Sequence, residues 1–367
     1  MTHYLSVKEK YEDCIVFYRL GDFYEMFFDD AIEASELLDL TLTGRDCGLK
    51  DRAPMCGIPF HAADTYIAKL VSMGKKVAIC EQLTEPGAQK GLVERDVVRV
   101  VTGGTVIEDN LVDEKSNNFI CCVYIGDNCA LSWADITTGE FFCQQLSSVD
   151  KLLDALYRVN ASEIICNDAG YEYYKNLADG VKSSVVKFSP YKEQCFLFSN
   201  SKKCLLEQFS VATLDGFIPS DKNCAISAAG ALVSYLKETQ MHSLCNIKNL
   251  SYYDDGNFLI LDASAQRNLE VLKSIRDGKV YGSLLWAVDF TKTAGGARKL
   301  KEVLTSPLHD ADAINYRLDG VEDLYKDNLT REAIADSLKS IKDLERLSGR
   351  ISNNILTPRD ARAIADT

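Results

Sequence analysis

The sequence predicts a mixed α/β protein of several domains, in which two α/β domains are followed by an all-helical segment. Its 367 residues exceed the roughly 250–300 that one hydrophobic core usually holds. Strand-like and helix-like patterns alternate up to about residue 250, and strand patterns stop beyond Asp262. No window approaches the ~18 consecutive apolar residues of a membrane span, and the N-terminus has no apolar signal segment. We therefore expect a cytoplasmic protein with no membrane partner.

Residues 1 to about 110 predict a small α/β domain. The run CIVFYRL (14–20) is apolar and rich in β-formers, which predicts a strand. The residues that follow Gly21-Asp22 predict a helix, because their apolar positions fall on one helical face. This face consists of Phe27, Ala31, Ala34 and Leu38. Further along, the patterns predict a helix over 65–75 that ends at Gly74, and strands over 77–80 and 96–101.

Residues from about 118 to 250 predict a mixed sheet flanked by helices. Three strand-like runs come first, and alternating helices and strands follow them. Gly126-Asp127 predicts a hairpin and Thr138-Gly139 a turn. The predicted strands cover 118–126, 129–136, 139–146, 162–168 and 183–189, and the predicted helices cover 147–160 and 171–179.

The last third of the chain predicts helices only. Asp262 and Asp310 are side-chain N-caps for helices over 263–275 and 311–327. The second of these helices carries an apolar stripe, formed by Ile314, Leu318, Val321 and Leu324. Thr357-Pro358 opens a final helix that runs only to Thr367. Because isolated helices shorter than ~12–15 residues are marginal, we expect this domain to be interrupted.

Cysteine usage and net charge exclude two classes of protein. The thirteen cysteines form no CxxC pair and the four histidines do not cluster near them, which predicts reduced, buried thiols and no metal site. The net charge of -13 excludes a basic coat that binds nucleic acid non-specifically. A local DNA-reading surface remains compatible with this charge.

The most informative segment is FYRLGDFYEMFFDDA (17–31), a strand, a Gly-Asp turn and an aromatic-rich helix start. It resembles the mismatch-recognition segment of the MutS family of bacterial DNA mismatch-repair proteins, in which a Phe-x-Glu triplet lies between strand and helix. The matching residues are Phe23 and Glu25. Further similar stretches follow in order along the chain: PMCGIPFHAADTYIAKLV (54–71), VAICEQ (77–82), VERDVVRVVTGGTV (93–106), ADITTGEF (134–141), LDASAQRNLEV (261–271) and GSLLWAVDFTKTAGGARKLKEVLTSPL (282–308).

The resemblance implies recognition of mismatched base pairs and small insertion/deletion loops in duplex DNA, the first step of mismatch repair. It implies that Phe23 is an apolar wedge inserted from the minor groove, and that Glu25 accepts a hydrogen bond from the displaced base. On correctly paired DNA the same charge is expected to find no partner and to oppose binding. The implied domains are a small α/β mismatch-recognition domain (1–107), an RNase H-like α/β connector (112–247) and the truncated start of an all-α core/lever domain (255–367).

The residues alone leave a structural interpretation open. Phe23 lies four residues before Phe27, so it could pack in the core on the same helical face. Glu25 lies three residues after Asp22, which is the spacing of a helix-capping pair. Under this interpretation neither residue would contact DNA.

Charge placement predicts a phosphate-contacting surface beside the wedge. Residues 1–43 carry three Lys/Arg against ten Asp/Glu, whereas residues 44–100 carry nine against seven. The alternative for these basic residues, which are Arg45, Lys50, Arg52, Lys69, Lys75, Lys76, Lys90, Arg95 and Arg99, is a solvated face of mixed charge. Further residues that we expect at the DNA interface are Asp22, Met55, His61, Lys76 and Arg99, with Met55 and His61 placed there by the resemblance.

Two enzymatic alternatives lack part of the residue set that they need. Asp135 stands on a strand, as the first metal ligand of RNase H-like nucleases does, but two-metal cleavage needs three or four converging carboxylates. Asp168 is a poorly matched second ligand. The run TAGGARK (293–299) lacks the GxxxxGK[ST] phosphate loop. We therefore expect no catalytic residue and no cofactor in this chain, and the resemblance implies ATP and Mg²⁺ only for a C-terminal ATPase domain outside it.

The resemblance also implies the partners. These are duplex DNA with a mismatch, a second MutS subunit bound mainly through domains outside this chain, and MutL. The alternative function is that of a MutS-paralogue scaffold for branched or recombining DNA. The Phe-x-Glu triplet separates the two, because such paralogues lack this domain or its wedge.

Overall fold

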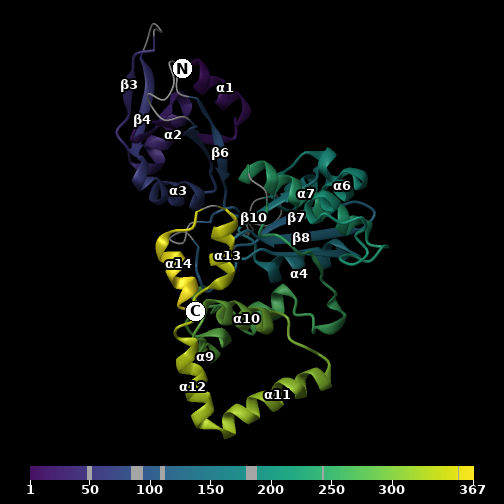
Figure 1. Cartoon of the computed structure of the whole chain (residues 1–367). Coiled ribbons are helices and arrows are strands. Elements are labelled where there is room, and N and C mark those ends of the chain that lie inside the picture. The colour runs from purple at the N-terminus through teal and green to yellow at the C-terminus, as the bar shows by residue number, and fades with distance from the viewer. Residues whose placement is uncertain (48–51, 84–93, 108–111, 179–187, 242–243, 354) are drawn as a thin grey trace. The chain divides into compact units, whose positions relative to one another are not determined.

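The computed structural model describes the chain except residues 48–51, 84–93, 108–111, 179–187, 242–243 and 354 (Figure 1). The described residues form two compact units. Unit 1 comprises Met1–Leu111 and Tyr235–Ser243, and unit 2 comprises Val112–Ser234 and Leu244–Thr367. The second sheet and the helical last third therefore belong to one unit. The boundaries predicted for the three domains stay predictions.

Unit 1 is built on a six-stranded sheet in the order β3-β4-β2-β1-β5-β6. β1 and β5 are parallel and the other neighbours are antiparallel. The predicted strand over 14–20 and helix over 65–75 are confirmed as β1 and α3, and Gly74 follows α3 with a positive φ. The elements are α1 (Thr2–Lys10), β1 (Cys14–Leu20), β2 (Phe23–Phe27), α2 (Phe28–Leu38), β3 (Thr43–Arg45), β4 (Ala53–Pro59), η1 (Phe60–Ala62), α3 (Ala63–Ser72), β5 (Lys76–Gln82) and β6 (Arg95–Val101).

The helix predicted directly after Gly21-Asp22 is wrong in its first five residues. These residues form β2, which pairs with β1 across the turn and with β4 on its other side. Tyr24 and Met26 are buried on one face of the strand, whereas Phe23 and Glu25 lie on the opposite face. An aromatic-rich run of five residues is compatible with the periodicity of a helix or of a strand. It forms a strand here because it pairs with a neighbouring strand on each side. The helix begins only at Phe28.

Helices cover both faces of this sheet. Tyr4 and Val7 of α1 pack on one face, in a cluster that includes Val16 and Phe27. On the other side α2 packs on β4 and β2, and the Cys56 thiol lies 3.4 Å from the Ala31 carbonyl oxygen. Figure 1 shows α2 and α3 beside β4. The sheet thus holds β2 between two neighbours while leaving its Phe23 end uncovered.

A buried carboxylate ties these layers together. Asp30, 3% exposed, accepts hydrogen bonds from the Tyr4 hydroxyl at 2.7 Å and the Val16 backbone N–H at 3.0 Å, and pairs with Lys8 at 2.8 Å. Burial and the Asp30 charge raise the pKa of Tyr4, so its hydroxyl stays a donor. Because these groups come from α1, β1 and α2, the cluster fixes the base of the β1–β2 hairpin.

Unit 2 contains a six-stranded sheet in the order β11-β10-β7-β8-β9-β12. The sheet is mixed, as the sequence predicts, but its sixth strand, β12, was not predicted. β7, β8 and β9 are antiparallel, and β10, β11 and β12 run parallel to their neighbours. Of the strand predicted over 183–189, residues up to 187 lie outside the described residues. The elements are β7 (Ile120–Ile125), β8 (Cys129–Asp135), β9 (Glu140–Leu146), α4 (Val149–Val159), β10 (Glu163–Cys166), α5 (Asp168–Ala178), β11 (Phe188–Pro190), η2 (Glu193–Phe196), α6 (Phe198–Phe209), α7 (Asn223–Gln240) and β12 (Ser251–Tyr252).

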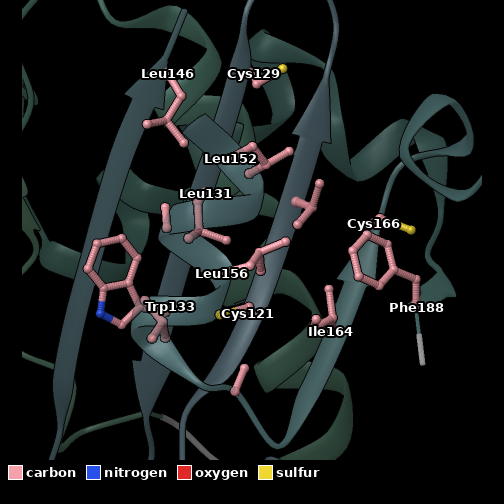
Figure 2. Packing of buried hydrophobic residues seen from close by; sticks show 14 residues of the cluster. Cys121, Cys129, Leu131, Trp133, Leu146, Leu152, Leu156, Ile164, Cys166 and Phe188 are labelled. Carbon is pink, nitrogen blue, oxygen red and sulfur yellow. The ribbon is translucent and has the colours of Figure 1, made fainter. Parts of the chain in front are cut away.

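The core of this sheet lies under α4. Figure 2 shows Leu152 and Leu156 of α4 among sheet side chains that include Leu131 and Trp133. Eight of the thirteen cysteines are buried, which confirms the predicted burial of thiols. Burial raises the pKa of Cys166 to about 12, so this thiol is protonated at neutral pH and packs as a small apolar group.

The last third of the chain is helical, as predicted. The side chains of Asp262, Asp310 and Thr357 cap α8, α11 and α14, which confirms the three N-caps. The helix predicted over 263–275 is too long, since α8 ends at Asn268 and Glu270 has a φ of 47°. The elements are η3 (Asp255–Asn257), α8 (Ala263–Asn268), α9 (Leu284–Val288), α10 (Ala294–Thr305), α11 (Ala311–Lys326), α12 (Asn328–Leu338), α13 (Leu344–Ser352) and α14 (Pro358–Ala365).

The apolar stripe of α11 does not face a core. Leu318 and Val321 are 55% and 63% exposed, and Figure 1 shows α11 and α12 extending from the rest of unit 2. The helical period was therefore predicted correctly, but the described residues do not cover the stripe. In the part of the chain that the structure describes, we find no helix with the length and apolar composition to cross a membrane.

Candidate nucleic-acid interface

The candidate site lies at the turn end of the β1–β2 hairpin. Gly21 has a φ of 60°, which an L side chain rarely adopts, so glycine allows the tight turn before Asp22. Phe23 begins β2 and lies between Leu20 of β1 and Pro59 of β4. Its side chain is 48% exposed. The core-packing interpretation of Phe23 is therefore wrong, because nearly half of the ring meets solvent.

Glu25 lies two residues further along the same face of β2. Residues at this spacing point to the same side of a sheet, about 7 Å apart. α2 begins three residues after Glu25, and its N-cap residue is Phe27. The helix-capping interpretation of Glu25 is therefore wrong. Phe23 and Glu25 instead present an apolar ring and a carboxylate on the same face of β2, toward its exposed Phe23 end.

The carboxylate of Glu25 has a partner that the sequence did not indicate. Nη1 of Arg45, on β3, lies 2.5 Å from Oε2 of Glu25. The guanidinium lies 5.9 Å from the centroid of the Phe27 ring as it crosses the face toward Glu25. The Arg45 side chain is 46% exposed and that of Glu25 is 19% exposed. Pairs as exposed as this one contribute only ~0.2–1 kcal/mol to stability, so a ligand can rearrange them.

A second aromatic group lies at the same end of the sheet. Phe60 is 41% exposed, and its backbone N–H donates to the Asp22 carbonyl at 3.0 Å. The Arg19 guanidinium lies 3.7 Å from the centroid of the Phe60 ring and 5.5 Å from that of Tyr24. On the face of β2 opposite Phe23, the Tyr24 hydroxyl donates to Glu81, and burial together with Glu81 raises the pKa of Tyr24. These contacts fix the turn that carries Phe23.

The structure brings two of the other predicted interface residues to this end of the sheet and separates three. Asp22 is exposed in the turn itself, and His61 is exposed with its ring 5.8 Å from that of Phe60. Met55, on β4, is in register with Phe27 at the opposite end of β2 from Phe23, and it is half-buried against the cluster around Phe27.

Lys76 and Arg99 lie away from Phe23. Lys76 pairs in register with Cys14, at the opposite end of β1 from Leu20, which is about 20 Å along the strand. Its ammonium group lies 2.9 Å from Asp13. Arg99 lies on β6, the edge strand, three strands from β2 in the sheet order, or about 14 Å. As interface residues both stay predictions, but neither belongs to the group around Phe23.

The nuclease alternative receives no geometric support in unit 2. Asp135 is fully buried and accepts hydrogen bonds from the Asn118 N–H, the Thr137 N–H and the Thr137 hydroxyl at 3.0, 2.8 and 2.6 Å. Asp168 follows β10 at the other end of the sheet, since β10 and β7 are parallel and Asp135 lies beside the start of β7. Within the described ranges, no three Asp, Glu, His or Cys side chains are grouped to hold a metal ion. Asp135 therefore stabilises the end of β8 by accepting hydrogen bonds from the residues around it.

Fold and site together define a multi-domain α/β protein that presents an aromatic ring and a carboxylate on an exposed hairpin. Three family models match the chain: MutS domain I over residues 1–110, MutS domain II over 118–250 and MutS domain III over 264–367. The site lies in the part that matches domain I.

Curated relatives give the same result. The DNA mismatch repair protein MutS of Lachnoclostridium phytofermentans is 42% identical over the whole chain, and that of Ruminiclostridium cellulolyticum is 43% identical. The MutS protein of Clostridium kluyveri is 41% identical over 99% of the chain. The chain spans 40 to 42% of the length of these relatives. The chain belongs to the MutS family.

Proposed function

We propose that this chain binds duplex DNA at mismatched base pairs and small insertion/deletion loops and thereby initiates DNA mismatch repair. The observation that carries the proposal is the exposed ring of Phe23 with the Glu25 carboxylate beside it, in the unit that matches MutS domain I. The same pair favours mismatch recognition over the scaffold alternative, which needs no wedge. The names of the relatives support the process, DNA mismatch repair.

Phe23 has the position that an intercalating wedge needs. Minor-groove proteins insert an apolar side chain between base steps and kink the duplex by roughly 20–90°, at an unstacking cost of a few kcal/mol. A mismatched pair has already lost part of its pairing energy, so it unstacks more cheaply than a matched pair. Stacking of the ring on a base contributes ~1–3 kcal/mol. Deformability therefore selects the mismatch, and the ring stabilises the deformed state.

Glu25 supplies an acceptor beside the wedge. A base that leaves its pair exposes N–H groups that Watson–Crick pairing otherwise occupies. A carboxylate oxygen is a strong acceptor for such a donor, because a charged hydrogen bond is about twice as strong as a neutral one. On paired DNA the donors are already occupied, and the carboxylate gains nothing. Glu25 is not a lone charge on this strand face, since Arg45 pairs with it.

The remaining partners are proposals that follow from the family. We propose that the part matching MutS domain II offers a surface to MutL, and that a second MutS subunit encloses the DNA. ATP and Mg²⁺ are expected to bind outside these 367 residues. For this chain alone we expect weak DNA binding, with a dissociation constant of about 1 µM or weaker, which is typical of contacts dominated by phosphates.

Replacement of the wedge tests the proposal. We expect Phe23→Ala to lower the ratio between the dissociation constants for homoduplex and for G·T or unpaired-T duplex by about tenfold, because the stacking contribution is lost. Fluorescence anisotropy with labelled duplexes at low ionic strength measures this ratio. Phe198→Ala is the control, since Phe198 is a similarly exposed phenylalanine (41%) in unit 2. A ratio unchanged by Phe23→Ala would reject the wedge, and a nanomolar affinity of the chain alone would contradict the expected weak binding.

A further inference from the structure

The two oxygens of the Glu25 carboxylate have different environments. Oε2 takes the single contact from Nη1 of Arg45 at 2.5 Å. Among the described residues, no hydrogen bond or ion pair engages Oε1. The pair is therefore held through one oxygen, although an arginine can bind both oxygens of a carboxylate at once. The second acceptor oxygen of this carboxylate, two residues from Phe23 on the same face of β2, is left unused among the described residues.

Glycine occupies the position opposite Glu25 on the neighbouring strand, where a Cβ would lie 3.3 Å from the Tyr24 carbonyl oxygen. The residue opposite Glu25 on β4 is Gly57, and a Cβ added there would lie 3.6 Å from Cγ of Glu25. Any larger side chain at this position would cover the carboxylate. Arg45 is in register with Ala53, four residues from Gly57 along β4, so its side chain reaches Glu25 diagonally across β4.

We propose that Arg45 is a specificity-determining positioning residue: it holds Oε2 of Glu25, so that Oε1 is aimed beside Phe23 to accept an N–H from a displaced base. This inference rests on the proposed function and names a residue that sets its selectivity. Arg45 also balances the carboxylate charge, so that DNA phosphates near the hairpin do not meet an unpaired anion. Discrimination then comes from the hydrogen bond to Oε1, which mismatched DNA supplies and paired DNA does not.

A double-mutant cycle between Arg45 and Glu25 tests the proposal. We expect Arg45→Ala to weaken binding of both duplexes, because it leaves an unpaired carboxylate beside the DNA. The mismatched duplex should lose more, so that the ratio of homoduplex to mismatch dissociation constants falls about fivefold. In the Glu25→Gln background the same substitution should leave the ratio unchanged, because no charged acceptor remains to be positioned.

A conservative variant and a matched control separate positioning from general charge. Arg45→Lys should restore most of the ratio, since one N–H donor and one positive charge suffice for a contact to a single oxygen. Arg52→Ala removes the same charge from the neighbouring strand connection without a contact to Glu25, and should weaken both duplexes alike. Thermal unfolding of each variant checks that unit 1 stays folded.

The outcomes distinguish this inference from the proposed function. If Phe23→Ala lowers the ratio while Arg45→Ala weakens both duplexes equally in both backgrounds, Arg45 contacts phosphate only and the positioning role is overturned. If Phe23→Ala leaves the ratio unchanged, the proposed function itself fails. The positioning role is supported if Arg45→Ala lowers the ratio of homoduplex to mismatch dissociation constants and Arg45→Lys restores it. In the Glu25→Gln background, Arg45→Ala should then leave the ratio unchanged.

Discussion

Glu25 in unit 1 and Asp135 in unit 2 are both carboxylates on strands, and their surroundings differ. The sequence suggested a DNA contact for Glu25 and a metal ligand for Asp135. Asp135 is fully buried, and both of its oxygens accept hydrogen bonds from neighbouring backbone and side-chain groups. Glu25 is partly exposed and uses one oxygen, for an exposed arginine. A carboxylate with every acceptor position in use stabilises its fold, whereas one with an unused oxygen on an open face is available to a ligand.

The arginines of the two units show the same contrast. Arg298 of α10 is buried, and it contacts both oxygens of Asp343 at 2.6 and 2.8 Å, Glu345 at 2.5 Å and the Glu114 carbonyl at 3.0 Å. Among the described residues Arg45 makes one ion pair, with Glu25, and it exposes nearly half of its side chain. The comparison predicts that substitutions in unit 2 change stability, and that substitutions at the hairpin change binding.

The largest expected effect is that of Asp135→Ala. It withdraws the acceptor from the Thr137 N–H and hydroxyl and from the Asn118 N–H in a buried place, so we expect unit 2 to lose about 3–5 kcal/mol of unfolding free energy. Urea unfolding followed by tryptophan fluorescence measures it, because Trp133 is buried in this unit. Asp127→Ala, an exposed acid at the β7–β8 turn, is the control. A loss of unfolding free energy below about 1 kcal/mol would show that Asp135, like Glu25, contributes little to the stability of its unit.

The next effect is that of Arg298→Ala. We expect a loss of about 2–3 kcal/mol, most of it through Asp343, because Glu345 is more than half exposed and regains water. Urea unfolding with the same fluorescence signal measures it, and Lys299→Ala, the next residue on α10 with an exposed side chain, is the control. Equal losses of unfolding free energy in Arg298→Ala and Lys299→Ala would show that the buried Arg298–Asp343 pair stabilises unit 2 no more than an exposed pair does.

The same pair predicts a dependence on pH. Burial by itself would raise the pKa of Asp343, but the hydrogen bond and charge of Arg298 overcome burial and hold that pKa below its usual value. Stability from this carboxylate is therefore present above the ordinary aspartate pKa of ~3.9 and is lost as pH falls through the lowered value. In Arg298→Ala the stability difference from wild type should shrink below about pH 4, and a constant difference across acid pH would contradict the pair.

Glu140→Gln is expected to stabilise unit 2. Burial, and then the charges of Asp135 and Glu345, raise the pKa of Glu140, so its ionised form opposes folding. A neutral amide keeps an acceptor for Asn117 and removes the repulsion, with an expected gain below about 1 kcal/mol at neutral pH. As pH falls through the raised pKa, the wild-type carboxyl takes up a proton in the folded state and the gain should vanish. Urea midpoints at neutral and acid pH test the sign, and a destabilised variant at pH 7 would overturn it.

These differences explain which parts of the molecule could be predicted from the sequence. The strands over 14–20 and 120–125 were predictable, because a continuous apolar run rich in β-formers fits no amphipathic helix. The strand over 23–27 was not, because only its pairing with β1 and β4 excludes a helix. The exposure of the α11 stripe could not be predicted either, since periodicity shows a face and not what covers it.

The candidate site divides in the same way. Phe23 and Glu25 are neighbours along the chain and were found through a local resemblance. Arg45 is twenty residues away from Glu25 and reaches it through the sheet order β3-β4-β2, which no local pattern encodes. The signal that could have indicated it is a single basic residue in a short strand-like run, TLTGR, and such residues are common on solvated faces. Contacts across a sheet need the register, and the register comes from the whole domain.

The smallest expected effect is that of Glu25→Gln on stability, and it tests the comparison most directly. Because its only described partner is an exposed arginine, we expect the unfolding free energy of unit 1 to change by no more than about 0.5 kcal/mol. Amide hydrogen exchange on β1 and β2 measures it, with Asp30→Asn as the control that should lose several times more, since Asp30 is buried among three donors. A loss of 1–2 kcal/mol or more in Glu25→Gln would make this carboxylate as structural as Asp135. Near-native protection together with a lower preference for mismatched DNA would show that the exposed pair on the hairpin is kept for binding, since it then adds almost nothing to the fold.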